Sequence, residues 1–171
     1  MKRLVIKVGT AVLTQDGQLA IERMENLVDL IAKLKNEKNL EVILVSSGAV
    51  GAGFTTLKLD KKIISNKQAL AAIGQPLLLK HYKKRFKEHN INCAQMLFIA
   101  DDFDSRKRTK NAQDVMEILL ENNILPIINE NDVIANYELL FGDNDQLAAH
   151  VAFHFKADML AILSDIDGYY N

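Results

Sequence analysis

A run of four apolar, mostly β-branched residues, Val42–Val45, places the strongest constraint on the fold. A short run of this kind, without polar alternation, is typical of a strand that is covered on both faces. Similar runs recur at residues 124–128 and 159–163, and segments with helical spacing lie between them. Strands that alternate with helices in this way build a mostly parallel sheet between helical layers. The sequence therefore predicts an α/β, three-layer fold.

The remaining elements follow from apolar spacing and from turn residues. We expect further strands over residues 4–8 and 92–99, and helices over residues 21–38 and 66–89. The longer helix should be interrupted at Gly74-Gln75-Pro76, because proline disfavours the helical state of its predecessor. Asn111 is predicted to cap a third helix, and Asp143 or Asn144 a fourth.

Composition limits the class of protein. The 171 residues are 49% hydrophobic and 25% charged, which suits one globular domain. A net charge of -1 gives no reason to expect nucleic acid or a membrane as partner. The single cysteine, Cys93, suits a reducing compartment, and no signal peptide or membrane span is evident, so we expect a cytoplasmic protein. Because the chain stops soon after a strand, it is expected to be the front part of a longer domain.

Two of the expected strands end in turns of glycine and hydroxyl residues, one at Gly9 and one at Ser47-Gly48. Such turns let the backbone approach an anion and point free N–H groups at it. In parallel sheets, ligands bind beyond the carboxyl ends of the strands. The spacing from Gly48 to Gly53 matches neither the dinucleotide fingerprint nor a P-loop, because Phe54-Thr55 stands where the P-loop has its lysine.

Lys7 occupies the last turn of an otherwise apolar strand. A buried ammonium group is costly unless an anion compensates it. Its charged end could instead reach solvent at the end of the strand. Because Gly9, Ser47 and Gly48 would supply donors beside it, we favour a bound anion as the partner of Lys7.

Between Lys110 and Lys156 the chain has eight acidic residues and no lysine or arginine. Four of these acidic residues lie, together with three asparagines, in two segments, Asn129–Asp132 and Gly142–Asp145. Uncompensated acids repel one another, so a substrate ammonium, a metal ion or a distant lysine could lie among them. A solvated acidic loop is the alternative reading. His150 and His154 have helical spacing but lack a third ligand, so no metal site is predicted.

Taken together, these motifs resemble those of the amino-acid kinase family over the whole chain, residues 1–171. The resemblance implies an eight-stranded, mostly parallel sheet and ATP-dependent phosphorylation of the γ-carboxylate of L-glutamate, toward proline. The most specific segments are the two acidic ones. The segments that carry the resemblance are Ile6–Thr10, Val45–Gly53, Pro126–Asp132, Gly142–Asp145 and Leu163–Asp165.

The resemblance also implies roles for single residues. Lys7 would contact the transferring phosphoryl group, Gly9 and Gly48 would donate backbone N–H groups to it, and Asp145 would orient Lys7. Ser164 and Asp165 would form the first edge of the nucleotide-binding site. The residues that would contact glutamate are Ser47, Asp132 and Asn144, with Asn129 and Asp143 as secondary candidates.

The chemistry of the reaction agrees with these roles. A carboxylate with a pKa of about 4.3 is ionised at neutral pH, so it needs no general base. The reaction does need positive charge around the phosphoryl oxygens, which Lys7 would supply. Mg²⁺ would be carried mainly by the phosphates of ATP. The resemblance also implies a second phosphate-binding lysine and most of the adenine pocket in a downstream segment, which we expect to lie beyond Asn171.

Alternatives remain at this stage. The chain could phosphorylate acetylglutamate or carbamate, or it could be a non-catalytic module that binds an amino acid. Acetylglutamate has no free ammonium group, so it offers the acidic residues no positive charge to bind. Family members form homo-oligomers, and a dimer or tetramer is therefore expected.

Overall fold

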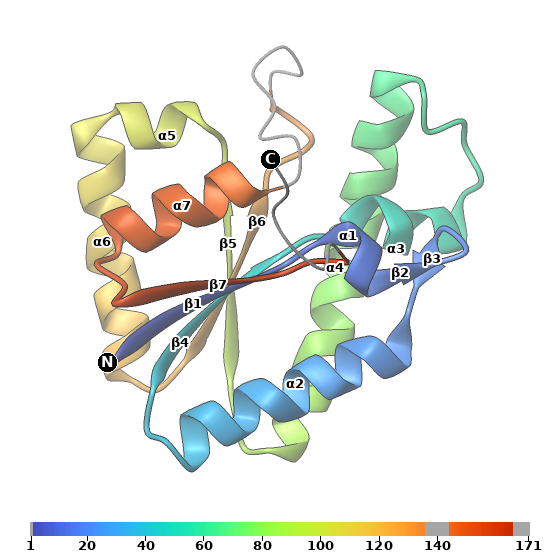
Figure 1. Ribbon diagram of the computed structural model, residues 1–171. Coiled ribbons are helices and arrows are strands. Elements are labelled where there is room, and N and C mark those ends of the chain that lie inside the picture. The colour runs from blue at the N-terminus through green and yellow to red at the C-terminus, as the bar shows by residue number, and fades with distance from the viewer. Residues whose placement is uncertain (1, 136–143, 166–171) are drawn as a thin grey trace, which may run out of the picture.

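The computed structural model describes residues 2–135 and 144–165 (Figure 1). Its main sheet has five strands in the order β5-β6-β4-β1-β7, and every neighbouring pair is parallel. A small antiparallel hairpin, β2 (Thr14–Gln15) and β3 (Gln18–Leu19), lies beside it. The α/β prediction is confirmed: the main sheet has five strands within the described residues, and the eight strands that the resemblance implies for the whole domain stay a prediction. The sheet strands are β1 (Arg3–Val8), β4 (Glu41–Ser46), β5 (Cys93–Phe98), β6 (Leu125–Glu130) and β7 (Met159–Leu163).

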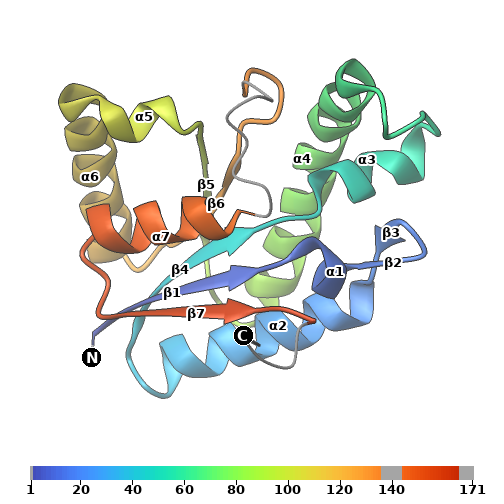
Figure 2. The same ribbon diagram turned by 45° about the horizontal axis from the view of Figure 1, so that its top comes forward.

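Helices cover both faces of the sheet (Figures 1 and 2). α2 and α4 lie against one face and α5, α6 and α7 against the other, while α1 and α3 follow the ends of β1 and β4. The helices are α1 (Thr10–Leu13), α2 (Ile21–Asn36), α3 (Ala49–Thr56), α4 (Ile64–Glu88), α5 (Asp101–Asp104), α6 (Arg106–Glu121) and α7 (Asp145–His154).

The apolar strands explain why the molecule has two cores. Successive side chains of a strand point to opposite faces. Leu4 and Ile6 of β1 therefore pack with α2 and α4, whereas Val5 packs with α6 and α7. The apolar run at Val42–Val45 supplies both cores in the same way, and all four of its residues are fully buried. This arrangement confirms the strand that the sequence predicts most strongly.

Helix α4 corrects one prediction, because it runs without interruption through Pro76. The helix packs closely on α3. A Cβ atom at Gly74 would lie 1.7 Å from the carbonyl oxygen of Ala49, and one at Gly53 would lie 1.9 Å from that of Leu70. Proline removes one N–H bond from a helix, but packing of this extent overrides the local preference.

The beginning of α6 corrects another prediction. The helix starts at Arg106, and the hydroxyl of Ser105 accepts a hydrogen bond from the Arg108 N–H. Asn111, the expected cap, therefore lies inside the helix. Serine is as good a capping residue as asparagine, and apolar periodicity alone does not say which polar residue ends the preceding loop.

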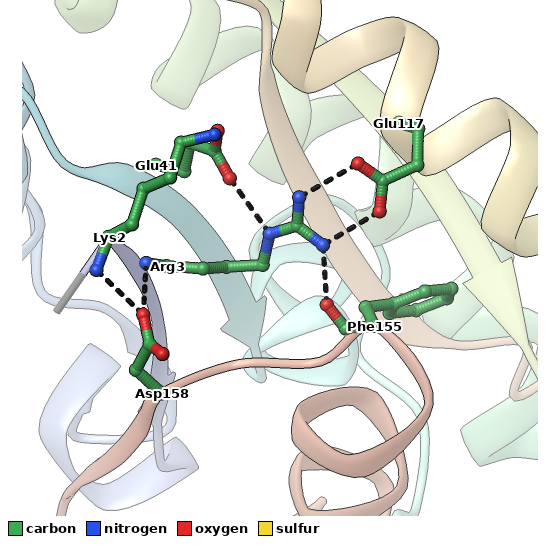
Figure 3. Close-up of polar contacts among 6 residues, drawn as sticks. All are labelled: Lys2, Arg3, Glu41, Glu117, Phe155 and Asp158. Carbon is green, nitrogen blue, oxygen red and sulfur yellow. Dashed lines mark hydrogen bonds and ion pairs between the residues drawn. The ribbon is translucent and has the colours of Figure 1, made fainter.

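A network of charges joins the elements at the amino ends of the strands (Figure 3). The guanidinium of Arg3 donates to the Glu41 carboxylate, to both oxygens of Glu117 and to the Phe155 carbonyl, at 2.6–2.9 Å. Asp158 accepts from the Arg3 N–H at 2.9 Å. Hydrogen bonding to Glu117 raises the pKa of Arg3 despite its burial. This network ties β1 to β4, α6 and the approach to β7, at the edge opposite the glycine turns.

Among the described helices, none has the length and apolar character that crossing a membrane requires.

Candidate functional site

The carboxyl ends of the parallel strands bring the candidate residues to one edge of the sheet (Figure 2). β1 ends before Gly9, β4 before Ser47, β6 before Asn131 and β7 before Ser164. These four strands are neighbours in the sheet, and α7 begins beside them. The structure therefore assembles segments that lie far apart in the sequence.

Lys7 is the charged residue most completely buried there, with 1% of its surface exposed. It lies on β1 between Val45 of β4 and Ile162 of β7. Its Nζ atom is 2.7 Å from Oδ1 of Asp145, the first residue of α7. The Asp145 side chain is about half exposed. This ion pair offsets part of the cost of burying the ammonium group and holds it at the strand ends.

The side chain of Asn144 joins three segments. Its Nδ2 atom donates to the Ser46 carbonyl at 3.1 Å, to Oγ of Ser47 at 3.2 Å and to Oδ1 of Asn129 at 3.0 Å. Asn144 precedes α7 but does not cap it with its side chain, and its backbone is left-handed with φ of 56°. Asparagine tolerates this conformation better than most residues. The expectation that Asn144 or Asp143 caps α7 is therefore met by the position of Asn144 but not by its side chain.

Asn129, on β6, has one amide atom in use and one without a partner. Its Oδ1 atom accepts from Asn144 and from the Glu130 N–H, the latter at 2.9 Å. Its Nδ2 atom is buried and finds no acceptor among the described residues. A buried donor left unpaired costs about 1–3 kcal/mol. An acceptor atom of a ligand would remove that cost, which marks Asn129 as a candidate contact.

Two carboxyl groups near the end of β6 have raised pKa values. Burial raises the pKa of Glu130 to about 7, and the negative charge of Asp132 adds to the effect. Burial also raises the pKa of Asp132 to about 6, although a hydrogen bond from Gln75 opposes the rise. Groups of this kind favour a cationic ligand that restores their ionised state.

The two glycine turns differ in structure. Gly48 has a left-handed backbone, with φ of 96°, and its carbonyl accepts from the Ala52 N–H at the start of α3. A side chain would be strained there. The Gly9 N–H donates to the Leu163 carbonyl at 3.1 Å, which links the ends of β1 and β7. Gly48 therefore meets the conditions of an anion-binding turn better than Gly9.

The remaining candidate residues from the sequence are Ser164, Asp165, Asp143 and the two histidines of α7. Ser164 and Asp165 follow β7 at the same edge, and Asp143 lies outside the described residues. His150 and His154 stack on Phe103 and on one another. Within the two described ranges, no group of three or more His, Cys, Asp or Glu side chains could hold a metal ion.

Gln75 is the residue that sequence reasoning missed. Its side chain contacts the backbone of Glu130 and lowers the pKa of Asp132. It lies 55 positions before Glu130 in a helix, so no local pattern signals the contact.

Comparisons with known proteins agree with this geometry. The family model described as the amino acid kinase family matches residues 2–171. The chain is 57% identical to the glutamate 5-kinase of Wolinella succinogenes, over 100% of this chain and 67% of that protein. It is 54% identical to the glutamate 5-kinase of Leishmania donovani, over 99% of this chain and 64% of that protein. It is 48% identical to glutamate 5-kinase 2 of Bacillus subtilis, over 100% of this chain and 47% of that protein.

The chain thus spans between about half and two thirds of the length of these curated relatives. A product complex of isopentenyl phosphate kinase from T. acidophilum has a similar fold, with a TM-score of 0.65 and 14% identity over 99% of this chain and 73% of that one. The fold, the strand-end motifs and the family match lead to one conclusion: this chain belongs to the amino acid kinase family.

Proposed function

We propose that the protein catalyses ATP-dependent phosphorylation of the γ-carboxylate of L-glutamate, which gives L-glutamyl 5-phosphate for proline biosynthesis. Relatives that are 48–57% identical bear the name glutamate 5-kinase. The observation that carries the proposal is the placing of buried Lys7, paired with Asp145, at the sheet edge where Ser47, Asn129 and Asn144 meet.

The acceptor amino acid would bind through its charged ends. Asp132 would pair with the α-ammonium, because a carboxylate offers this group an opposite charge. The unpartnered Nδ2 of Asn129 would donate to a carboxylate oxygen of the substrate. Ser47 and Asn144 would hold the same ligand, because their hydrogen bonds already fix their orientation. Asp143 is a further candidate for this site.

Phosphoryl transfer would then depend on charge and position. The γ-carboxylate is ionised at neutral pH and attacks phosphorus directly, and ADP leaves with the electron pair of the broken P–O bond. Lys7 would neutralise charge on the transferring group, and Asp145 would hold its ammonium in place. The Gly48 N–H would donate to a phosphoryl oxygen, with Gly9 as a weaker donor because Leu163 already engages it.

The nucleotide would enter over the end of β7. Ser164 and Asp165 lie next to the strand that pairs with Lys7, so they are placed to border the phosphates. Mg²⁺ would be bound mainly by phosphate oxygens and would screen their charge. We propose that residues 1–171 form the acceptor half of the kinase domain and the first edge of its nucleotide site.

The test is a substrate panel measured on the full-length protein by ADP release. L-Glutamate should support turnover, whereas N-acetylglutamate and carbamate should not. N-acetylglutamate tests the role of the ammonium group, because acetylation removes the positive charge that Asp132 would bind. Turnover with acetylglutamate or carbamate alone would assign a different carboxylate kinase. Glutamate binding without ADP release would indicate a regulatory module.

Location and assembly are also proposals. We propose a cytoplasmic enzyme, where ATP and free glutamate are both available, that acts as a homo-oligomer of two or four chains. Light scattering of the purified protein measures the oligomeric state directly, and a monomer at micromolar concentration would contradict the proposed assembly.

A further inference from the structure

Gln75 joins three elements around the end of β6. It lies on α4, one residue before Pro76. Its Nε2 atom donates to the Glu130 carbonyl at 3.2 Å, and its Oε1 atom accepts from Nε2 of Gln95 on β5 at 3.2 Å. Both ends of this amide are therefore in use, which fixes the orientation of the side chain.

A second glutamine of α4 supports the same loop. Gln68 lies seven residues before Gln75, so the two side chains share one face of the helix. Its Nε2 atom donates to the Val133 carbonyl at 3.2 Å. On the other side, the Asn131 N–H donates to the Phe98 carbonyl at the end of β5. The loop that carries Asp132 is thus held between α4 and β5.

Of these supports, Gln75 also acts on charge. Burial disfavours the ionised form of the Asp132 carboxyl and raises its pKa. Hydrogen bonding from the loop backbone and from the Gln75 side chain opposes this rise by favouring the carboxylate. Without this donor, the loop would retain its backbone contacts but the carboxylate would lose a partner.

We propose that Gln75 is a positioning residue for the acceptor site: by holding the Glu130 carbonyl it fixes the loop that carries Asp132, whose carboxylate would face the ammonium group of the amino-acid substrate. The inference rests on the proposed function and adds to it a residue outside both acidic segments. Gln75 acts through Asp132 and does not itself touch the reacting atoms. Its effect should therefore appear in substrate affinity and leave the phosphoryl-transfer step almost unchanged.

A purely structural role makes a different prediction. If Gln75 only braced α4 against β5, an acceptor atom toward Gln95 would suffice. Gln75→Glu keeps that acceptor and the length of the side chain, but it loses both donated hydrogen bonds and adds a charge near Asp132. Gln75→Met keeps the shape and loses all the hydrogen bonds. The two variants therefore separate bracing from positioning.

The control is a glutamine with the same kind of bond far from the site. Gln113 on α6 donates from Nε2 to the His154 carbonyl at 2.8 Å. Gln113→Met should lower the melting temperature by a similar amount to Gln75→Met, because each loses a partly buried bond to a backbone carbonyl. It should leave the KM for glutamate within twofold of the wild type.

The experiment measures steady-state kinetics and melting temperature for the full-length wild type and these variants. We expect Gln75→Met to raise the KM for glutamate about tenfold and Gln75→Glu to raise it further, with kcat within about threefold and the KM for ATP unchanged. Hydrogen bonds to a charged group have effects of this order.

Several results would overturn the inference while leaving the proposed function intact. They are a Gln75→Glu variant with wild-type KM for glutamate, a fall in kcat without a change in KM, or an equal rise in the KM for ATP. A wild-type protein that does not phosphorylate glutamate would instead remove the proposed function, and the inference with it.

Discussion

The close approach of α3 and α4 makes Gly74 the position where one added methyl group should change stability most clearly. A Cβ atom there would lie 1.7 Å from the Ala49 carbonyl oxygen and 2.6 Å from the Gly53 backbone nitrogen. Ordinary contacts of a carbon atom are about 3.5 Å or longer. Both neighbours are backbone atoms, so the two helices must move apart.

The magnitude follows from two opposing effects. Overpacking in a well-packed core costs about 1–3 kcal/mol, and a contact with two backbone atoms belongs at the upper end. Replacing glycine by alanine inside a helix returns about 1 kcal/mol. We therefore expect Gly74→Ala to lower the free energy of unfolding by about 2 kcal/mol. For a domain of this size that corresponds to a fall in Tm of roughly 4–8 °C.

The assay is urea denaturation and thermal melting followed by circular dichroism. Gly51→Ala on α3 is the matched control, because its Cβ atom would meet the Thr14 methyl group at 2.8 Å, and that side chain can move. The control should be close to neutral. A Gly74→Ala variant as stable as the wild type, or an equal loss of stability in Gly51→Ala, would contradict a clash between the two helices.

Four further predictions concern the site and the charge network. Lys7→Ala should lower kcat of the full-length enzyme about a hundredfold or more, as loss of one transition-state donor does, and near-normal turnover would exclude Lys7 from the mechanism. Asp132→Asn should raise the KM for glutamate but not for ATP. Burial raises the pKa of the Asp132 carboxyl to about 6, and the carboxyl must be ionised to bind an ammonium group. The wild-type KM for glutamate should therefore rise as the pH falls below about 6, and a KM that does not change between about pH 5 and pH 8 would contradict this. Arg3→Met should lower the free energy of unfolding by about 2–3 kcal/mol in urea denaturation, because the Glu41 side chain and the Phe155 carbonyl lose a buried partner; an unchanged midpoint would mean that solvent replaces the lost bonds.

The positions of the strands could be predicted from the sequence, because an apolar run forms a buried strand through its own residues. Val42–Val45 is apolar throughout, so this segment has to be covered on both faces wherever the chain folds. Parallel strands then bring their carboxyl ends to one edge. The sequence alone therefore predicts that Lys7, Ser47 and Asp132 lie at the same edge of the sheet. Their roles in the reaction came from family resemblance and stay predictions.

Helix ends and breaks were predicted less well. Ser105, not Asn111, begins α6, since either residue can supply a capping oxygen. Pro76 fails to interrupt α4, because glycine on both helices allows a contact with α3 that outweighs the local preference of the backbone. The choice of cap involves only about 1 kcal/mol and a proline inside a helix costs about 3 kcal/mol, and in both cases packing decides the outcome.

Within the site, the pattern of residue types came from the sequence and the pairing of side chains from the tertiary structure. A strand reveals its burial through its own residues, so Lys7 on an apolar strand already favoured a compensating anion. Which carboxylate sits at its Nζ atom, which amide atom of Asn129 is left without an acceptor, and that Gln75 reaches Asp132 all depend on segments that only the fold brings together. Hydrogen bonds act over about 3 Å, and no local sequence pattern specifies the position of a distant segment to that precision.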